Sequence, residues 1–119
     1  MSEHSLFDPA MLEGLLAYGD AAILRRVVET FQSSTSGVPA QIELLARSDD
    51  WAGLAFAAHS LKSGSGVMGL TALADLAKDL ESAAKAHEAE AAKQAVARLP
   101  DLYQTSCGIL RKFAAELPG

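Results

Sequence analysis

The fold of this 119-residue chain is decided in the stretch AHSLKSGSGVMGL, residues 58–70. Leu54, Leu61 and Met68 recur at a spacing of seven residues, which places them on one face of a helix because residues three, four and seven apart share a face. At about 100° per residue, His59 lies roughly 160–220° around the axis from this apolar face. The stretch therefore predicts a helix that buries its apolar residues and turns His59 towards solvent.

The predicted face around His59 consists mainly of small side chains. Its other members are Ala52, Ala55, Phe56, Lys62, Ser63 and Gly66. Gly64 and Gly66 each cost roughly 1 kcal/mol relative to alanine inside a helix. Either the helix ends near them, with Gly69 as the expected end, or the surface has to stay open. We interpret the small residues as clearance for a large molecule that approaches the imidazole.

An exposed histidine one helical turn before a lysine suits phosphoryl chemistry. Imidazole is mostly neutral at physiological pH, and neutral imidazole is a good nucleophile. Lys62 can bring a flexible ammonium group within reach of phosphate oxygens. This pair alone is weak evidence, and the small residues around it strengthen the interpretation.

The segment Ala58-His59-Ser60-Leu61-Lys62, followed by small residues up to Gly69, resembles the signature of histidine-containing phosphotransfer (HPt) domains. The resemblance in motif extends to residue 81, and the chain length and helix order also fit. The leucine-rich helix that usually follows the motif is matched by Leu73, Leu76, Leu80 and Glu81. One position departs, since Ser63 stands where the family usually has glycine. Serine is still small, and its hydroxyl would lie near the phosphoryl group or alter docking.

This resemblance implies a helical bundle that carries a phosphoryl group on one histidine and exchanges it with receiver-domain aspartates. By the same resemblance, His59 is the phosphoacceptor through Nε2, and Lys62 stabilises the phosphoryl charge. Clearance and docking are assigned to Ala55, Phe56, Ser63 and Gly66. The partner is a response-regulator receiver domain, a hybrid histidine kinase, or both. The receiver supplies Mg²⁺, so we expect no cofactor on this chain and no kinase or ATPase activity of its own.

Composition limits the other classes of function. The net charge of −5 argues against nucleic acid as a partner, which requires a basic face. No apolar run is long enough for a transmembrane span, and residues 1–5 lack the features of a signal peptide, so we expect a cytoplasmic protein. The single Cys107 permits neither an internal disulfide nor a thiolate metal cluster. His87, beside Glu88 and Glu90, lacks the spacing of a helical metal site, and His4 lies in an expected tail.

Helical periodicity continues along the whole chain, and the alternation typical of strands is missing. We expect helices near residues 9–18, 20–31, 38–46, 51–68, 71–84 and 96–117, with a bend or a short break near Arg98 because of Pro100. The predicted fold is all-α, an antiparallel four-helix bundle with two short additional N-terminal helices. It forms one domain over residues 1–119, with residues 1–7 as a flexible tail, and we expect a monomer.

Two alternatives to a phosphorelay intermediate stay open. A helical adapter without phosphate would use the same face to bind and inhibit a receiver or a histidine kinase. A purely structural helical domain would make His59 incidental and would bind no receiver. The phosphoacceptor half of a histidine kinase fits less well, because Ser63-Gly64 stands where that family has a proline. Met1 at the start favours a free-standing protein over a module of a larger kinase.

Overall fold

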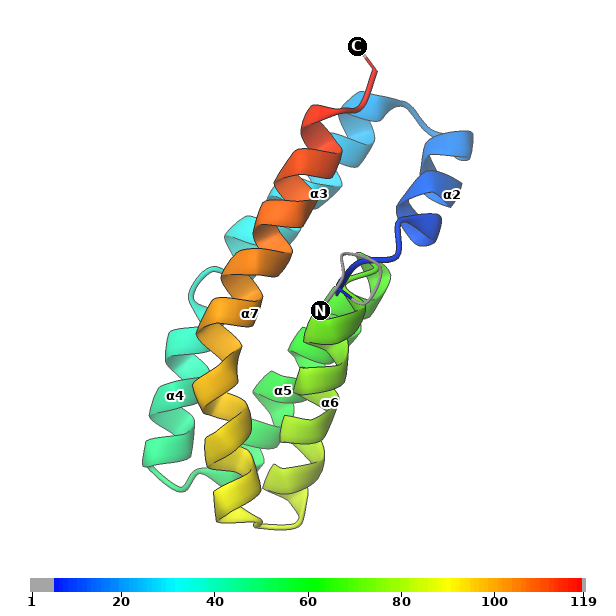
Figure 1. The fold of residues 1–119 in the computed structure, drawn as a ribbon. Coiled ribbons are helices and arrows are strands. Elements are labelled where there is room, and N and C mark those ends of the chain that lie inside the picture. The colour runs from blue at the N-terminus through cyan, green and yellow to red at the C-terminus, as the bar shows by residue number, and fades with distance from the viewer. Residues whose placement is uncertain (1–5, 119) are drawn as a thin grey trace.

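The computed structural model describes residues 6–118, and this range consists of helices joined by short connections (Figure 1). Within it lie six helices: α2 (Ala10–Tyr18), α3 (Ala21–Thr35), α4 (Val38–Arg47), α5 (Trp51–Val67), α6 (Thr71–Lys85) and α7 (Ala89–Ala115). No strand occurs between residues 6 and 118, as the sequence predicted. None of these helices is long and apolar enough to cross a bilayer. Residues 1–5, which include His4, and residue 119 lie outside the described range.

The centre of the bundle is the hairpin of α5 and α6, and α7 packs against α6 (Figure 1). α4 packs against α5 and α7, and α3 lies along the other half of α7. Only Ser36 and Gly37 separate α3 from α4, so the polar segment of residues 33–37 is a junction between two helices. The resulting molecule is elongated, with extents of 46 × 26 × 20 Å.

The second helix differs from the sequence prediction of two short N-terminal helices. α2 is short, with 9 residues, but α3 has 15 residues and packs against α7. Its buried stripe of Leu24, Val28 and Phe31 explains this length, because that stripe spans two turns and faces the core. α3 is therefore part of the bundle.

Local signals fix where α5 begins and ends. The Asp50 side chain accepts a hydrogen bond from the backbone N–H of Gly53 at 2.9 Å, which caps the first turn. Beyond the last turn, Gly69 adopts a φ of +75°, a conformation that side chains rarely tolerate. A Cβ on Gly69 would also collide with the carbonyl oxygen of Asp8. Glycine is thus required in the turn that leads into α6.

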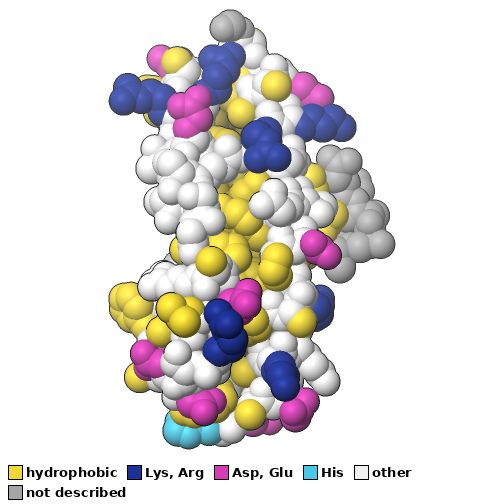
Figure 2. Space-filling model, turned by 90° about the vertical axis from the view of Figure 1, so that its left-hand side faces the viewer, with side chains coloured by type: hydrophobic (Ala, Val, Ile, Leu, Met, Phe, Trp, Pro, Cys, Tyr) yellow, Lys and Arg dark blue, Asp and Glu magenta, His cyan; other side chains and the backbone are white. Residues whose placement is uncertain are grey.

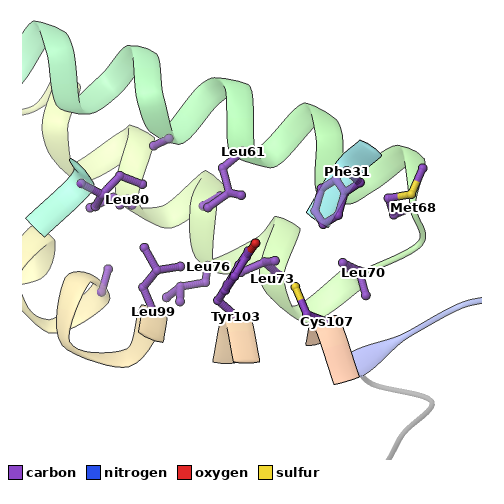
Figure 3. Close-up of a cluster of buried hydrophobic side chains, with 14 of the residues drawn as sticks. Phe31, Leu61, Met68, Leu70, Leu73, Leu76, Leu80, Leu99, Tyr103 and Cys107 are labelled. Carbon is purple, nitrogen blue, oxygen red and sulfur yellow. The ribbon is translucent and has the colours of Figure 1, made fainter. Parts of the chain in front are cut away.

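The core is filled mainly by leucines from α5, α6 and α7, with Phe31 entering from α3 (Figure 3). The three residues expected to point inwards on α5, Leu54, Leu61 and Met68, are at most 4% exposed, which confirms the predicted face. Burying a leucine contributes roughly 1.5–3 kcal/mol, so this packing fixes the rotation of α5. The opposite face of α5 is thereby turned outwards.

Phe7 belongs to the core, although the sequence placed it in a flexible tail. Its side chain is 8% exposed, and its ring meets that of Phe113 edge-on with centroids 5.6 Å apart. The backbone N–H of Asp8 donates to the carbonyl of Gly69 at 2.8 Å. The tail prediction is therefore wrong for residue 7, because two adjacent apolar residues, Leu6 and Phe7, in a short segment produce no periodic pattern.

α7 runs without a break from Ala89 to Ala115 through Pro100. The predicted interruption near Arg98 does not occur. A proline leaves one backbone carbonyl of the preceding turn without an N–H partner. Pro100 is exposed, so water can bind that carbonyl and the helix continues.

Figure 2 shows the side of the molecule that is covered by α3, α4 and α7. Hydrophobic side chains run along the middle of this face, and acidic and basic side chains are interspersed, mostly nearer its two ends. Binding of nucleic acid depends on a clustered basic patch. On this face most basic side chains lie near the upper end, with acidic side chains among them (Figure 2).

Candidate functional site

α5 presents His59 on the side opposite its buried residues. The His59 side chain is 55% exposed, and Phe56, one turn earlier, is 74% exposed. The face also contains Ala55 and Lys62, which are half-buried, and Ser63 and Gly66, which are exposed. The structure thus places all six predicted site residues on one face of α5, with the imidazole open to solvent.

The two glycines near His59 have different causes. A Cβ on Gly64 would lie 3.4 Å from the edge of the Phe31 ring, so this glycine faces the Phe31 side chain of α3 at about van der Waals distance. A Cβ on Gly66 would have no atom within 4 Å. Nothing inside the protein therefore requires glycine at position 66, and its absence of a side chain only keeps the surface open.

Glu81 of α6 reaches the face of α5 and binds two of the predicted site residues. Its Oε2 accepts a hydrogen bond from Nδ1 of His59 at 3.1 Å, and its Oε1 accepts one from Nζ of Lys62 at 2.9 Å. Lys85, one turn further along α6, places its Nζ 3.0 Å from the same Oε2. The Glu81 side chain is only 8% exposed. One buried carboxylate thus joins the imidazole and two lysines, and we call these four residues the surface cluster.

The charges of the surface cluster determine which nitrogen of His59 is free. The ammonium groups of Lys62 and Lys85, with the hydrogen bond from His59, lower the pKa of Glu81 from 4.5 to about 2, against the effect of burial. An ionised carboxylate only accepts hydrogen bonds, so Nδ1 of His59 carries a hydrogen. In a neutral ring, the lone pair then lies on Nε2. The site therefore holds a nucleophilic nitrogen in a fixed orientation.

Glu81 and Lys85 are the site residues that sequence reasoning missed. Glu81 entered it only as part of the leucine-rich helix, and Lys85 not at all. The sequence did hold a signal for Glu81. It lies on the buried stripe of α6, whose members include Leu73, Leu76, Ala77, Leu80 and Ala84. A carboxylate in such a stripe is rarely buried unless it is paired, and so it indicates a partner on a neighbouring helix.

The other histidine within the described range has a structural role. His87 adopts a φ of +54° in the turn between α6 and α7, and its ring stacks on that of Trp51 with centroids 5.2 Å apart. Across residues 6–118, no group of three or more His, Cys, Asp or Glu side chains is arranged to hold a metal ion. The chemistry of the described part of the chain thus centres on the surface cluster.

Comparisons with known proteins agree with this geometry. The family model of the Hpt domain matches residues 26–107, a range that includes His59, Lys62, Glu81 and Lys85. The fold is similar to the crystal structure of histidine-containing phosphotransfer protein B (HptB) from Pseudomonas aeruginosa PAO1. The TM-score is 0.85 at 20% sequence identity, with 94% of this chain and 96% of that chain covered. No curated protein matches the chain. The protein therefore belongs to the Hpt domain family, whose members act in histidine phosphotransfer.

Proposed function

We propose that this protein is a phosphorelay intermediate that accepts a phosphoryl group on Nε2 of His59 and exchanges it with the aspartate of a receiver domain. One observation carries the proposal: Nδ1 of His59 is bound to the buried, ionised Glu81 at 3.1 Å. This contact leaves Nε2 as the free nitrogen of an exposed ring. Membership of the Hpt family supports phosphoryl transfer as the reaction, and the contact with Glu81 supports Nε2 of His59 as the atom that accepts the group.

The chemistry follows from the position of the carboxylate. The lone pair of Nε2 attacks the phosphorus of an aspartyl phosphate, the N–P bond forms, and the P–O bond breaks with its electrons going to the aspartate. The hydrogen on Nδ1 stays in place, so the imidazole ring gains positive charge. Glu81 lies 3.1 Å from Nδ1 and stabilises that charge. In the reverse reaction the same charge makes the ring a good leaving group.

Little further machinery is needed on this chain, because phosphoryl transfer depends mainly on positioning and on stabilising charge. In this proposal the receiver supplies Mg²⁺, and the protein alone has neither kinase nor ATPase activity. The receiver would dock on the face of Ala55, Phe56, Ser63 and Gly66. Beside this face, Phe56 also lines a groove of about 430 Å³ between α5 and the α3–α4 junction, which offers apolar contact.

We further infer that the molecule is an antiparallel four-helix bundle in which α3 and α4, end to end, take the place of one of the four helices. The pairs that pack together support this arrangement, since α7 contacts both α3 and α4. A cytoplasmic location and a monomeric state stay predictions of the sequence. Light scattering of the purified protein at micromolar concentration tests the second of these.

The deciding experiment is transfer from a panel of phosphorylated receiver domains to wild type, His59→Gln and His87→Gln. We expect acid-labile, alkali-stable label on wild type and on His87→Gln, and no label on His59→Gln. The helical circular dichroism of His59→Gln should match that of wild type, because the side chain is exposed. Label on His59→Gln would refute the assignment. Binding of receivers without any label would instead favour the inhibitory adapter.

A further inference from the structure

The two lysines of the surface cluster are held differently. Lys62 comes from α5, is 34% exposed, and contacts Oε1 of Glu81 at 2.9 Å. Lys85 comes from α6, is 67% exposed, and contacts Oε2 at 3.0 Å. Oε2 is also the atom that accepts the hydrogen bond from Nδ1 of His59. The ammonium group of Lys85 and Nδ1 of His59 therefore share one carboxylate oxygen, and Lys62 binds the other.

A buried carboxylate has to keep at least one cation. Removing a charge from water is costly, and a buried ion that loses its partner is strongly destabilising. Lys62 is the better candidate for the permanent partner because it is the less exposed of the two lysines. The effect on the pKa of Glu81 agrees, since the hydrogen bond from Lys62 is its largest cause.

Lys85 is free to leave at little cost. The Lys85 side chain is 67% exposed, so its ammonium group stays largely hydrated, and its contact with the buried Glu81 across one turn of α6 is more strongly screened by water than that of Lys62. When Lys85 moves away, Glu81 still holds Lys62 and the Nδ1 hydrogen of His59. The surface cluster thus contains one cation that can be released while the imidazole keeps its orientation.

A phosphoryl group on Nε2 brings nearly two negative charges to the exposed side of the ring. We propose that Lys85 is the cation that moves to this phosphoryl group, while Lys62 stays as the counter-ion of Glu81. This inference rests on the proposed function and reassigns the role that the sequence gave to Lys62. Lys85 then binds the phosphoryl group, and Lys62 acts as a positioning residue.

The test compares Lys85→Met, Lys62→Met and Lys78→Met with wild type. Lys78 is an exposed lysine on α6, one turn before Glu81, and serves as the control for loss of one positive charge. Each protein is phosphorylated with phosphoramidate, so that no receiver contributes contacts, and the phosphoryl titration is followed by ³¹P NMR. His59→Gln identifies the signal that belongs to His59. Urea unfolding measures the stability of each variant.

A cation near the phosphoryl group favours its dianion, so losing Lys85 should raise the titration midpoint by about half a pH unit. Lys78→Met should leave the midpoint unchanged. Lys62→Met should lower the urea midpoint more than Lys85→Met does, and it should also raise the ³¹P midpoint, because Lys85 then has to stay as the counter-ion of Glu81. If Lys62→Met does not fold, Lys62→Arg, which keeps a cation on Glu81, should retain the wild-type ³¹P midpoint.

The outcomes separate this inference from the proposed function. A ³¹P midpoint that moves in Lys62→Met and not in Lys85→Met, or in neither, overturns the role of Lys85 while phosphorylation of His59 stands. Wild type that acquires no phosphoryl group at His59, with phosphoramidate or with any receiver, overturns the proposed function itself.

Discussion

Two polar clusters join helices of this protein. They differ in whether all of their polar atoms have hydrogen-bond partners. The surface cluster lies between α5 and α6, and Nε2 of His59 has no hydrogen-bond partner within residues 6–118. The core cluster lies between α3 and α7 and consists of Gln32, Thr35, Tyr103 and the carbonyl of Cys107. In it, the hydroxyls of Thr35 and Tyr103 lie 2.7 Å apart, and Nε2 of Gln32 donates to Cys107 at 3.0 Å. One cluster leaves a reactive atom open and the other is closed.

The two clusters also shift the acidity of their central groups in opposite directions. Cations lower the pKa of Glu81 to about 2, whereas burial raises the pKa of Tyr103 to about 12. Each of these two groups therefore keeps a single protonation state near neutral pH, and the hydrogen-bonding pattern around it does not change with pH in that range. The comparison teaches that a rigid polar network indicates function only where it holds a reactive atom whose lone pair has no hydrogen-bond partner in the protein. Variants of each cluster should therefore separate transfer from stability.

The largest effect is expected for Glu81→Ala, which removes the acceptor for Nδ1 of His59. Phosphoryl transfer should fall by roughly 10–100-fold, by analogy with the loss seen when the group that orients a metal-binding histidine is removed. Initial rates of label transfer from a phosphorylated receiver measure this effect. Glu81→Gln keeps an acceptor oxygen and should retain more activity than Glu81→Ala. If Glu81→Ala transfers at the wild-type rate while still folded, orientation of the ring by Glu81 is not required.

The core cluster should show the opposite pattern in Tyr103→Phe. Loss of the Tyr103 hydroxyl, which lies 2.7 Å from that of Thr35 and donates to the carbonyl of Gln32 at 3.4 Å, should lower the free energy of unfolding by about 0.5–1.5 kcal/mol for each hydrogen bond lost. The rate of phosphoryl transfer should not change, because Tyr103 is buried and belongs to α7. Urea unfolding together with the transfer assay measures both. A marked loss of transfer in the folded variant would show that the two clusters are coupled.

Alkaline pH gives an internal control for this variant. The folded pKa of Tyr103 is raised from 10 to about 12, so its contribution to stability is complete below pH 10 and is lost as pH rises towards 12. The difference in stability between wild type and Tyr103→Phe should therefore shrink over this window. A constant difference would mean that the phenol does not titrate differently in the folded and unfolded states.

The surface cluster also shows which features of the site could be predicted from the sequence. The face of His59 was predictable because it depends only on spacing within one helix, and the burial of Leu54, Leu61 and Met68 confirms that face. The contact with Glu81 was not, because it joins residues 22 positions apart through the relative rotation of α5 and α6. Spacing determines a face, but it does not determine which residues of two faces meet.

The fold was predictable to a similar degree. Helical periodicity located the six helices of residues 6–118, since it depends on the pattern of each segment alone, but it placed the start of the last helix near residue 96 and not at Ala89. The burial of Phe7 and the continuity of α7 through Pro100 depend on packing and solvent exposure, which a local pattern does not contain. The length of α3 was underestimated for the same reason, because the packing of its apolar stripe on α7 is not contained in the pattern of that segment.

The smallest effect sharpens the contrast at the edge of the surface cluster. Gly66 and Gly14 both lie in helices at exposed positions, and a Cβ on either would have no atom within 4 Å. Gly66 lies on the face of His59, whereas Gly14 lies on α2. These two positions are matched in exposure and in the free space around them, and they differ in their distance along the chain from the proposed docking face.

Alanine at either position should stabilise the isolated protein by up to about 1 kcal/mol, because helical glycine carries that cost. The gain should be smaller at Gly66, which is the penultimate residue of α5, where helices fray. Gly66→Ala should nevertheless slow transfer from a receiver, since its methyl group enters the docking face, and should leave phosphorylation by phosphoramidate unchanged. Gly14→Ala should leave both reactions unchanged. A receiver reaction equally fast in Gly66→Ala and wild type would mean that the glycine provides no clearance, and its cost in stability would then need another cause.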